Sequence, residues 1–132
     1  MRSSLALWRL TALFGFLGVA FGAFGAHGLA NKIDARSLEI WEIGVKYQMW
    51  HALALGLAAL MHERGGERAA RFAGLSFTAG IVLFSFSLYA LALGAPKWFG
   101  AITPFGGVLL MLGWLAFLGR AANGITERAS AS

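Results

Sequence analysis

Four apolar runs without a charged residue dominate the chain, at residues 10–26, 47–61, 72–93 and 98–119. A helix needs about 20 mostly apolar residues to cross a bilayer. Leu7 and Trp8 extend the first run to that length. The second run is short, but it can still span if Val45 and His62 lie in the headgroup zone and Lys46 snorkels outward. We therefore predict an all-α integral membrane four-helix bundle, a single domain over residues 1–132, with spans at about 7–27, 46–62, 72–93 and 98–119.

The connections between these runs are polar. Asp34 is placed to cap a helix on which Leu38, Trp41 and Val45 share one face. This pattern predicts a short amphipathic helix at the interface, between spans 1 and 2, with Trp41 as its anchor. The alternative is one bent helix that continues into the second span. The charged turn at 62–71 is short, so the second and third spans should be antiparallel neighbours.

The fourth run contains Thr103-Pro104 near its start. Threonine as the cap and proline as the first helical residue predict that the helix begins at Pro104, after an irregular lead-in over 98–102. The small, polar tail over 121–132 is expected to be disordered.

Small residues repeat on the predicted helices. Gly15, Gly18, Gly22 and Gly25 fall on one narrow stripe, as close approach of two helices in lipid requires. A signal peptide is the alternative for this N-terminal run, with Ala23-Phe24-Gly25 as a cleavage site, but a signal core has no use for such a stripe. The expected helix-packing residues are Gly15, Gly18, Gly22, Gly25, Ala52, Gly56, Gly106 and Gly113.

Composition agrees with a membrane protein, because 58% of the residues are hydrophobic and only 13% are charged, against about 25% in soluble domains. The net charge of +5 could suggest nucleic acid as a partner. However, the basic residues lie at the ends of the runs, where they orient spans, so we expect the lipid bilayer and no nucleic acid. The chain has no cysteine, which excludes disulfides and thiolate metal sites.

The distribution of Lys and Arg predicts the orientation. Four spans place seven basic residues on the side of the termini and four on the other: Arg2, Arg9, Arg64, Arg68, Arg71, Arg120 and Arg128 against Lys32, Arg36, Lys46 and Lys97. The positive-inside rule then places both termini in the cytoplasm.

In this orientation, polar side chains from all four spans fall in the outer half of the bilayer. The candidate pocket consists of His27, Tyr47, Gln48, His51, Ser85, Tyr89 and Thr103. Gly74, Thr78, Ser85 and Tyr89 share one side of the third span, while Ser87 points away. A hydrogen-bonded network that only holds the helices together would produce the same pattern.

Histidine is the member that could carry chemistry, because it titrates near neutral pH and binds metals and haem. His27 and His51 at similar depth could form a bis-His site. A structural histidine and a proton or ligand site are the other interpretations. No carboxylate is expected at that level to complete a metal site, so we predict no metal and no cofactor.

Carboxylates are confined to the predicted loops and tail: Asp34, Glu39, Glu42, Glu63, Glu67 and Glu127. Proton-coupled exporters of this size usually need a carboxylate inside the membrane, so that class is disfavoured. The sequence also lacks a nucleophile–base arrangement, a phosphate loop and a dinucleotide motif. We therefore expect a protein that is not an enzyme.

Four motifs in order resemble one family of small membrane proteins, catalogued as domain of unknown function 423, with bacterial and mitochondrial relatives. They are GAFGAHGL at 22–29, YQMWHAL at 47–53, LFSFSLY at 83–89 and AITPFGG at 101–107. The resemblance covers roughly Leu10 to Leu118. It departs at Phe86, where the family is expected to favour glycine. The resemblance implies four spans in the inner membrane, that is, a multi-pass protein of the bacterial cell membrane, and no established activity.

Two functions follow as hypotheses. The first is a structural or accessory component that supports membrane integrity or a larger complex, as a homo-oligomer or with other proteins. The second is a binding or conducting protein whose outer polar pocket takes a quinone, lipid, haem or small solute. A cavity beside His51 would favour the second hypothesis, and a fully hydrogen-bonded cluster the first.

Overall fold

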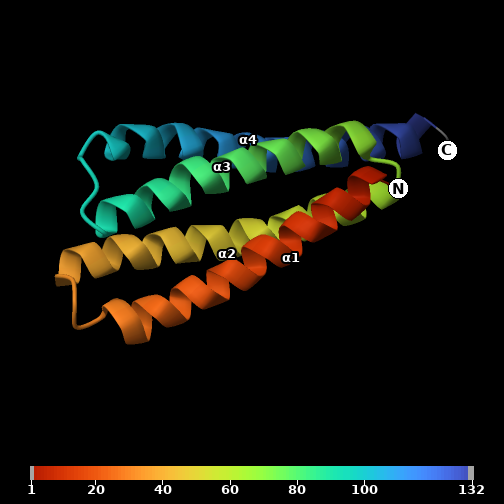
Figure 1. Cartoon of the computed structure of the whole chain (residues 1–132). Helices are drawn as coiled ribbons and strands as arrows, with labels where there is room; N and C mark the ends of the chain where they lie inside the picture. The colour runs from red at the N-terminus through yellow and green to blue at the C-terminus, as the bar shows by residue number, and fades with distance from the viewer. Residues whose placement is uncertain (1, 131–132) are drawn as a thin grey trace.

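The computed structural model describes residues 2–130. Every regular element in the described residues is a helix, which confirms the all-α prediction: α1 (Arg2–Ala23), the π-helical turn η1 (Phe24–Leu29), α2 (Ala35–Glu63), α3 (Glu67–Ala92) and α4 (Phe99–Ser130). The long helices run side by side with alternating direction, so that the N-terminus and the C-terminus lie at the same end of the molecule (Figure 1).

The first connection is compact and begins inside the apolar run. The π-helical turn η1 continues α1 up to Leu29, whose carbonyl oxygen accepts hydrogen bonds from the N–H groups of Lys32 and Ile33. Gly25 in this turn allows a close contact, because a Cβ atom there would lie 2.7 Å from Cδ1 of Trp41. The end of α1 is therefore packed directly against the start of α2.

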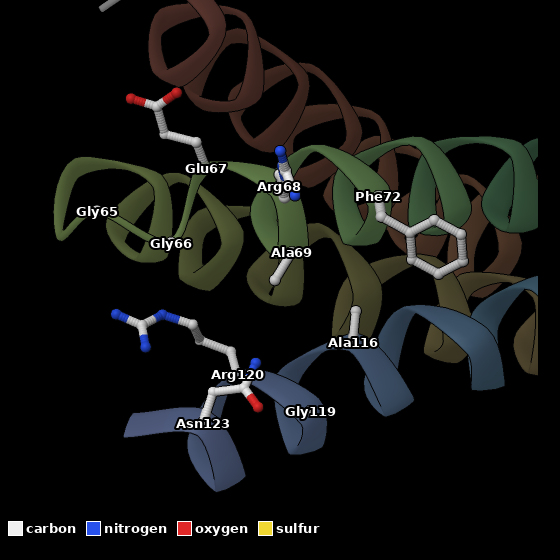
Figure 2. A pocket seen from close by; sticks show the side chains of 10 residues that line it. All are labelled: Gly65, Gly66, Glu67, Arg68, Ala69, Phe72, Ala116, Gly119, Arg120 and Asn123. Carbon is white, nitrogen blue, oxygen red and sulfur yellow. The ribbon is translucent and has the colours of Figure 1, made fainter. Parts of the chain in front are cut away.

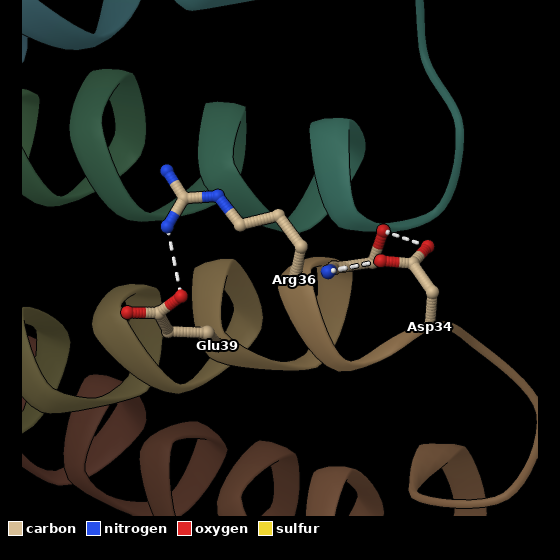
Figure 3. A network of polar contacts seen from close by, with 4 residues as sticks. Asp34, Arg36 and Glu39 are labelled. Atoms are coloured by element: carbon tan, nitrogen blue, oxygen red, sulfur yellow. Dashed lines mark hydrogen bonds and ion pairs between the residues drawn. The ribbon is translucent and has the colours of Figure 1, made fainter.

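α2 is one continuous helix from Ala35 to Glu63, so the prediction of a separate interfacial helix is wrong and its alternative of one longer helix holds. Asp34 does cap it, because its carboxylate accepts hydrogen bonds from the backbone N–H and the hydroxyl of Ser37, at 2.9 and 2.8 Å (Figure 3). No proline interrupts the segment from 35 to 63. Trp41 is only 3% exposed and is thus a core residue rather than an interface anchor.

The other two connections are tight turns that need glycine. Gly65, between α2 and α3, has φ +81°, and Gly94, between α3 and α4, has φ +92°, a region that side chains disfavour. α4 starts at Phe99 and contains Pro104 within the helix, so the predicted lead-in over 98–102 and the cap at Thr103 are wrong.

The loop explains the early start of α4. The carbonyl oxygens of Pro96, Lys97 and Trp98 each accept a hydrogen bond from the N–H group three residues further along, in residues 99–101, at 2.9–3.0 Å. The helix therefore does not need the threonine cap. At the other end α4 reaches Ser130, where the sequence predicted a disordered tail beyond residue 120, and the hydroxyl of Thr126 bonds to the carbonyl oxygen of Ala122.

Within residues 2–130, three helices are long and apolar enough to cross a membrane: Ser4–Leu29, Glu67–Ala92 and Phe99–Gly124. α2 is not among them, because its uncharged run at 47–61 is short and contains Gln48 and His51. It is nevertheless an inner helix, packed against α1 on one side and α3 on the other, while α4 packs on α3 (Figure 1). Most large exposed apolar side chains lie on the outer helices, for example Phe16 on α1 and Phe105 on α4.

Glycines line both outer contacts, with different neighbours. On α1, a Cβ atom at Gly18 would meet the Met49 side chain and one at Gly22 would lie 3.4 Å from Val45, whereas Gly15 has open space. On α4, a Cβ atom at Gly106 would collide with the backbone of Phe84. The stripe predicted for α1 is thus a helix contact at three of its four glycines, counting Gly25 above.

The remaining predicted packing residues also lie between helices. Ala52 is 1% exposed in the main apolar core. A Cβ atom at Gly56 would lie 3.4 Å from the methyl group of Thr11 on α1, and one at Gly113 would run into the ring of Phe77 on α3.

Candidate functional site

The seven polar residues predicted to share one pocket do not meet in a single cluster. Five of them belong to three separate hydrogen-bonded groups, Ser85 is buried without a partner, and one residue is exposed. The groups are centred on Gln48, on His51 and on Thr103, and His27 is the exposed residue.

Gln48 lies at the centre of the first group and is completely buried. Its amide nitrogen donates to the carbonyl oxygen of Phe14 on α1 at 2.9 Å, and its amide oxygen accepts from the hydroxyl of Tyr89 on α3 at 2.8 Å. One side chain of α2 therefore joins both neighbouring helices. Tyr89 is itself packed between Trp41 and Phe21, whose ring centroids lie 4.5 and 5.1 Å from its own.

His51 forms the second group and joins α2 to α4. Its Nδ1 lies 2.6 Å from the carbonyl oxygen of Tyr47, and its Nε2 lies 3.1 Å from the indole nitrogen of Trp114. A carbonyl oxygen can only accept and an indole N–H can only donate, so the proton belongs on Nδ1 and Nε2 is the acceptor. Both ring nitrogens of this neutral imidazole thus have protein partners. The Tyr47 ring stacks on the imidazole with a centroid distance of 6.1 Å.

Thr103 belongs to the third group, between α3 and α4. Its hydroxyl lies 2.7 Å from the hydroxyl of Ser87, which also donates to the carbonyl oxygen of Phe84. Ser87 thus points away from Tyr89, which faces α2, as the periodicity predicted, and it is Thr103 that lies on the other face of α3 from the predicted pocket. Ser85, predicted as a member, is fully buried instead, and its hydroxyl has no hydrogen-bond partner.

His27 and His51 are separated, which rules out the bis-His arrangement. His27 lies in η1 and is exposed. Gly25, two residues before His27, packs on Trp41 of α2. Trp41 precedes His51 by ten residues, which is about 15 Å along the helix at 1.5 Å per residue. The turn that carries His27 therefore packs about 15 Å along α2 from His51. The equal depth inferred from the sequence assumed that the helix began close to Tyr47, but α2 begins at Ala35, so His51 lies near its middle.

The main residue missed from the sequence is Trp114. It is 45% exposed, and its ring lies edge-on to His51 with a centroid distance of 6.0 Å. In an apolar run tryptophan counts as a hydrophobic residue, although its indole N–H needs an acceptor when it is removed from water. Because Trp114 lies in the middle of an apolar run, its indole N–H could have been predicted to need a hydrogen-bond acceptor on another helix.

Metal-binding chemistry has no support in the part of the chain that the structure describes. Among these residues no three His, Asp or Glu side chains gather to hold a metal ion. The buried polar groups join helices. The amide of Gln48 bonds to α1 and α3, and the imidazole of His51 bonds to α4 and to the backbone of its own helix.

These features define an all-helical membrane protein whose buried polar side chains connect its helices. Comparison with known proteins gives its family: residues 21–107 match the model described as "Protein of unknown function (DUF423)", and the chain belongs to this family. It is 45% identical over 107 residues to the UPF0382 membrane protein YwdK of Bacillus subtilis, covering 80% of this chain and 87% of the relative.

Two further relatives are similarly close. The UPF0382 membrane protein SSP2132 of Staphylococcus saprophyticus is 47% identical over 80% of this chain and 88% of its own length. A UPF0382 membrane protein of Haemophilus influenzae is 44% identical over 81% of this chain and 86% of its own length. No solved structure matches this chain. The family resemblance seen in the sequence motifs is thereby confirmed.

Proposed function

We propose that this protein is a non-enzymatic scaffold of the bacterial inner membrane, a structural or accessory component that supports membrane integrity or a larger membrane complex. The observation that carries the proposal is the use of the buried polar side chains. Gln48 bonds to α1 and α3, and His51 bonds to α4, so the chemically capable groups serve to join helices. In lipid such bonds take over part of the role that the hydrophobic effect has in water.

The proposal includes four spans. α1 and α3 are both apolar enough to cross, and they run in the same direction (Figure 1). The chain must therefore return across the bilayer between them, and α2 lies antiparallel between these two helices. Charged residues at its ends, such as Glu39 and Glu63, would then reach the two headgroup zones. The excess of arginines at the end with both termini favours a cytoplasmic location for that end.

The second hypothesis, a ligand pocket around His51, gains no such support. Two clefts lie at the α2–α3 turn, and His51 lines neither of them; their walls include Gly66, Met61 and Arg120. The unpartnered hydroxyl of Ser85 is enclosed by protein.

Histidine variants test the scaffold directly. His51→Ala removes the acceptor of the Trp114 indole and should lower the free energy of unfolding by roughly 0.5–2 kcal/mol, the scale of interhelical hydrogen bonds in membranes. His27→Ala is the matched control, because His27 is exposed, and should leave stability unchanged. The double variant should be additive. The measurement is the melting temperature in detergent, together with mass spectrometry of co-purified small molecules.

The opposite pattern would refute the scaffold role. If His51→Ala kept its melting temperature but lost a bound quinone, haem or other small molecule present in the unmodified protein, the histidine would be a ligand-binding residue.

A further inference from the structure

A cleft of about 770 Å³ opens where the turn between α2 and α3 meets the C-terminal part of α4 (Figure 2). Arg68 on α3 and Arg120 on α4 supply its positive charge, Asn123 adds a side-chain amide, and Phe72 and Ala116 form its apolar wall. Both helices are candidate spans that begin or end near this level, so the cleft lies where an apolar span meets the polar end of the molecule.

Arg120 crosses from α4 to the turn. A Cβ atom at Gly66 would lie only 3.1 Å from Nε of Arg120, so the glycine leaves the space that this side chain occupies. Figure 2 shows the guanidinium group directed along the Gly65–Gly66 side of the cleft. The guanidinium groups of two helices thus border one opening.

No carboxylate neutralises these arginines within the described side chains. Glu67 lines the cleft, but Figure 2 shows its carboxylate directed to the other side of the turn from Arg120. Glu63, at the end of α2, accepts a hydrogen bond from the indole of Trp8 instead. The ion pair found in the described region, Arg36–Glu39, lies near the start of α2, at the opposite end.

The chemistry of this opening fits a phosphate group. Guanidinium groups bind phosphate with paired, charge-assisted hydrogen bonds. The first N–H groups of α3 add a weaker preference for an anion, since the helix bonding there starts with Ala70 N–H to Gly66 C=O. The apolar wall distinguishes the source of the phosphate. A free phosphate ion has no use for an exposed Phe72, whereas an acyl chain does.

A second opening beside the first supports a lipid. It has a volume of about 500 Å³ and is lined by Leu57, Leu60, Met61 and Ala121 together with Arg64 and Arg120. Arg120 therefore lies between two hollows, each of which combines apolar side chains with an arginine. We propose that this arginine-lined cleft binds the phosphate of an anionic phospholipid, a role beyond the scaffold function that depends only on the spans of α3 and α4.

Native mass spectrometry of the full chain in detergent tests the proposal. The protein is titrated with dioleoyl phosphatidylglycerol and, separately, with dioleoyl phosphatidylcholine, and the dissociation constants are compared. The unmodified protein should prefer phosphatidylglycerol, and the double variant Arg68→Gln/Arg120→Gln should weaken its binding about thirtyfold, since each basic residue near anionic lipid contributes roughly a factor of five. Binding of phosphatidylcholine should change little.

Two further variants separate a built site from general charge. Arg71→Gln removes the same charge from the same end of α3 but lies outside the cleft, and it should keep the preference. Gly119→Leu removes no charge and adds a side chain at the cleft wall, where a Cβ atom meets nothing within 4 Å, so it should narrow the cleft and reduce the preference while raising helix propensity. The melting temperature of each variant checks that it is folded.

Three results would overturn the proposal. The first is equal binding of both lipids by the unmodified protein. The second is a loss of about fivefold in Arg71→Gln, equal to the share of one charge in the double variant, which would leave only diffuse electrostatic attraction. The third is that inorganic phosphate binds as tightly as phosphatidylglycerol, which would replace the lipid by a free anion.

Discussion

The two outer helices are attached to the inner pair in different ways. Three hydrogen bonds along its length join α1 to α2, from Trp8 to Glu63, from Gln48 to the carbonyl oxygen of Phe14 and from Trp41 to that of Phe21. α4 contacts α3 mainly by close packing, because Gly106 faces backbone and Gly113 faces a ring. It adds two hydrogen bonds to the inner pair, from Thr103 to Ser87 on α3 and from Trp114 to His51 on α2. In lipid, hydrogen bonds and close backbone approach are alternative sources of helix association. Both outer helices use both, but the glycines of α1 face side chains of α2, whereas Gly106 of α4 lies against the backbone of α3.

The closely packed α3–α4 interface should lose the most stability when a larger side chain is introduced. In Gly106→Leu, the new Cβ atom would lie 2.8 Å from the carbonyl carbon of Leu83 and even closer to the backbone of Phe84, which cannot rotate away. We expect a loss of about 3 kcal/mol, at the upper end of the usual cost of overpacking. Reversible unfolding in mixed detergent micelles, followed by circular dichroism, measures it.

The α1–α2 interface should tolerate a glycine-to-leucine change better. In Gly18→Leu the clash is with the flexible side chain of Met49, which can move, so we expect a loss of roughly 1 kcal/mol. Gly15→Leu is the matched control on the same helix, and its open surroundings predict no loss. Equal losses for Gly18→Leu and Gly106→Leu would contradict the distinction between the two interfaces.

A smaller effect belongs to the loop end of the α1–α2 interface, where Asp34 fixes the start of α2. The hydrogen bond from the backbone N–H of Ser37, together with that from the Ser37 hydroxyl, lowers the pKa of Asp34 below its ordinary value of 3.8. Because the folded-state pKa is the lower one, this group stabilises the fold above pH 3.8, and the contribution is lost as the pH falls through the folded-state pKa.

Asp34→Asn isolates this contribution, because asparagine also caps helices but does not titrate. The melting temperature of the unmodified protein should therefore fall relative to that of Asp34→Asn as the pH is lowered from 7 to 3. Parallel pH profiles for the two proteins would show that the cap carries no charge-dependent stability.

The sequence predicted the presence of the four long helices but not the residues at which they begin and end. The four apolar runs predicted four helices, and each is present. The start of α2 was misplaced because the charged residues from Arg36 to Lys46 were assigned to an interfacial helix. Only packing shows that Trp41 is buried there against Phe21 and Tyr89. Charged residues indicate where a helix leaves the lipid, but the helix itself can continue through them.

The sequence predicted which polar side chains lie between the helices, but not which of them bond to each other. Helical periodicity assigns Ser85 and Ser87 to different faces, yet it does not say which neighbour covers each face. In the structure Ser87 reaches Thr103, while Ser85 is enclosed without a partner. Partner identity depends on the rotation of each helix about its axis, and the apolar contacts that set this rotation are spread over the whole sequence.

The central claim is that the buried polar side chains hold helices together, and the bond between Gln48 and Tyr89 tests it most directly, because both side chains are buried and join α2 to α3. The measurement is a double-mutant cycle of unfolding free energies for Gln48→Leu, Tyr89→Phe and both together. We predict a coupling of about 0.6–1.7 kcal/mol, the range for interhelical hydrogen bonds in membrane proteins. Additive losses, or variants as stable as the unmodified protein, would contradict the claim.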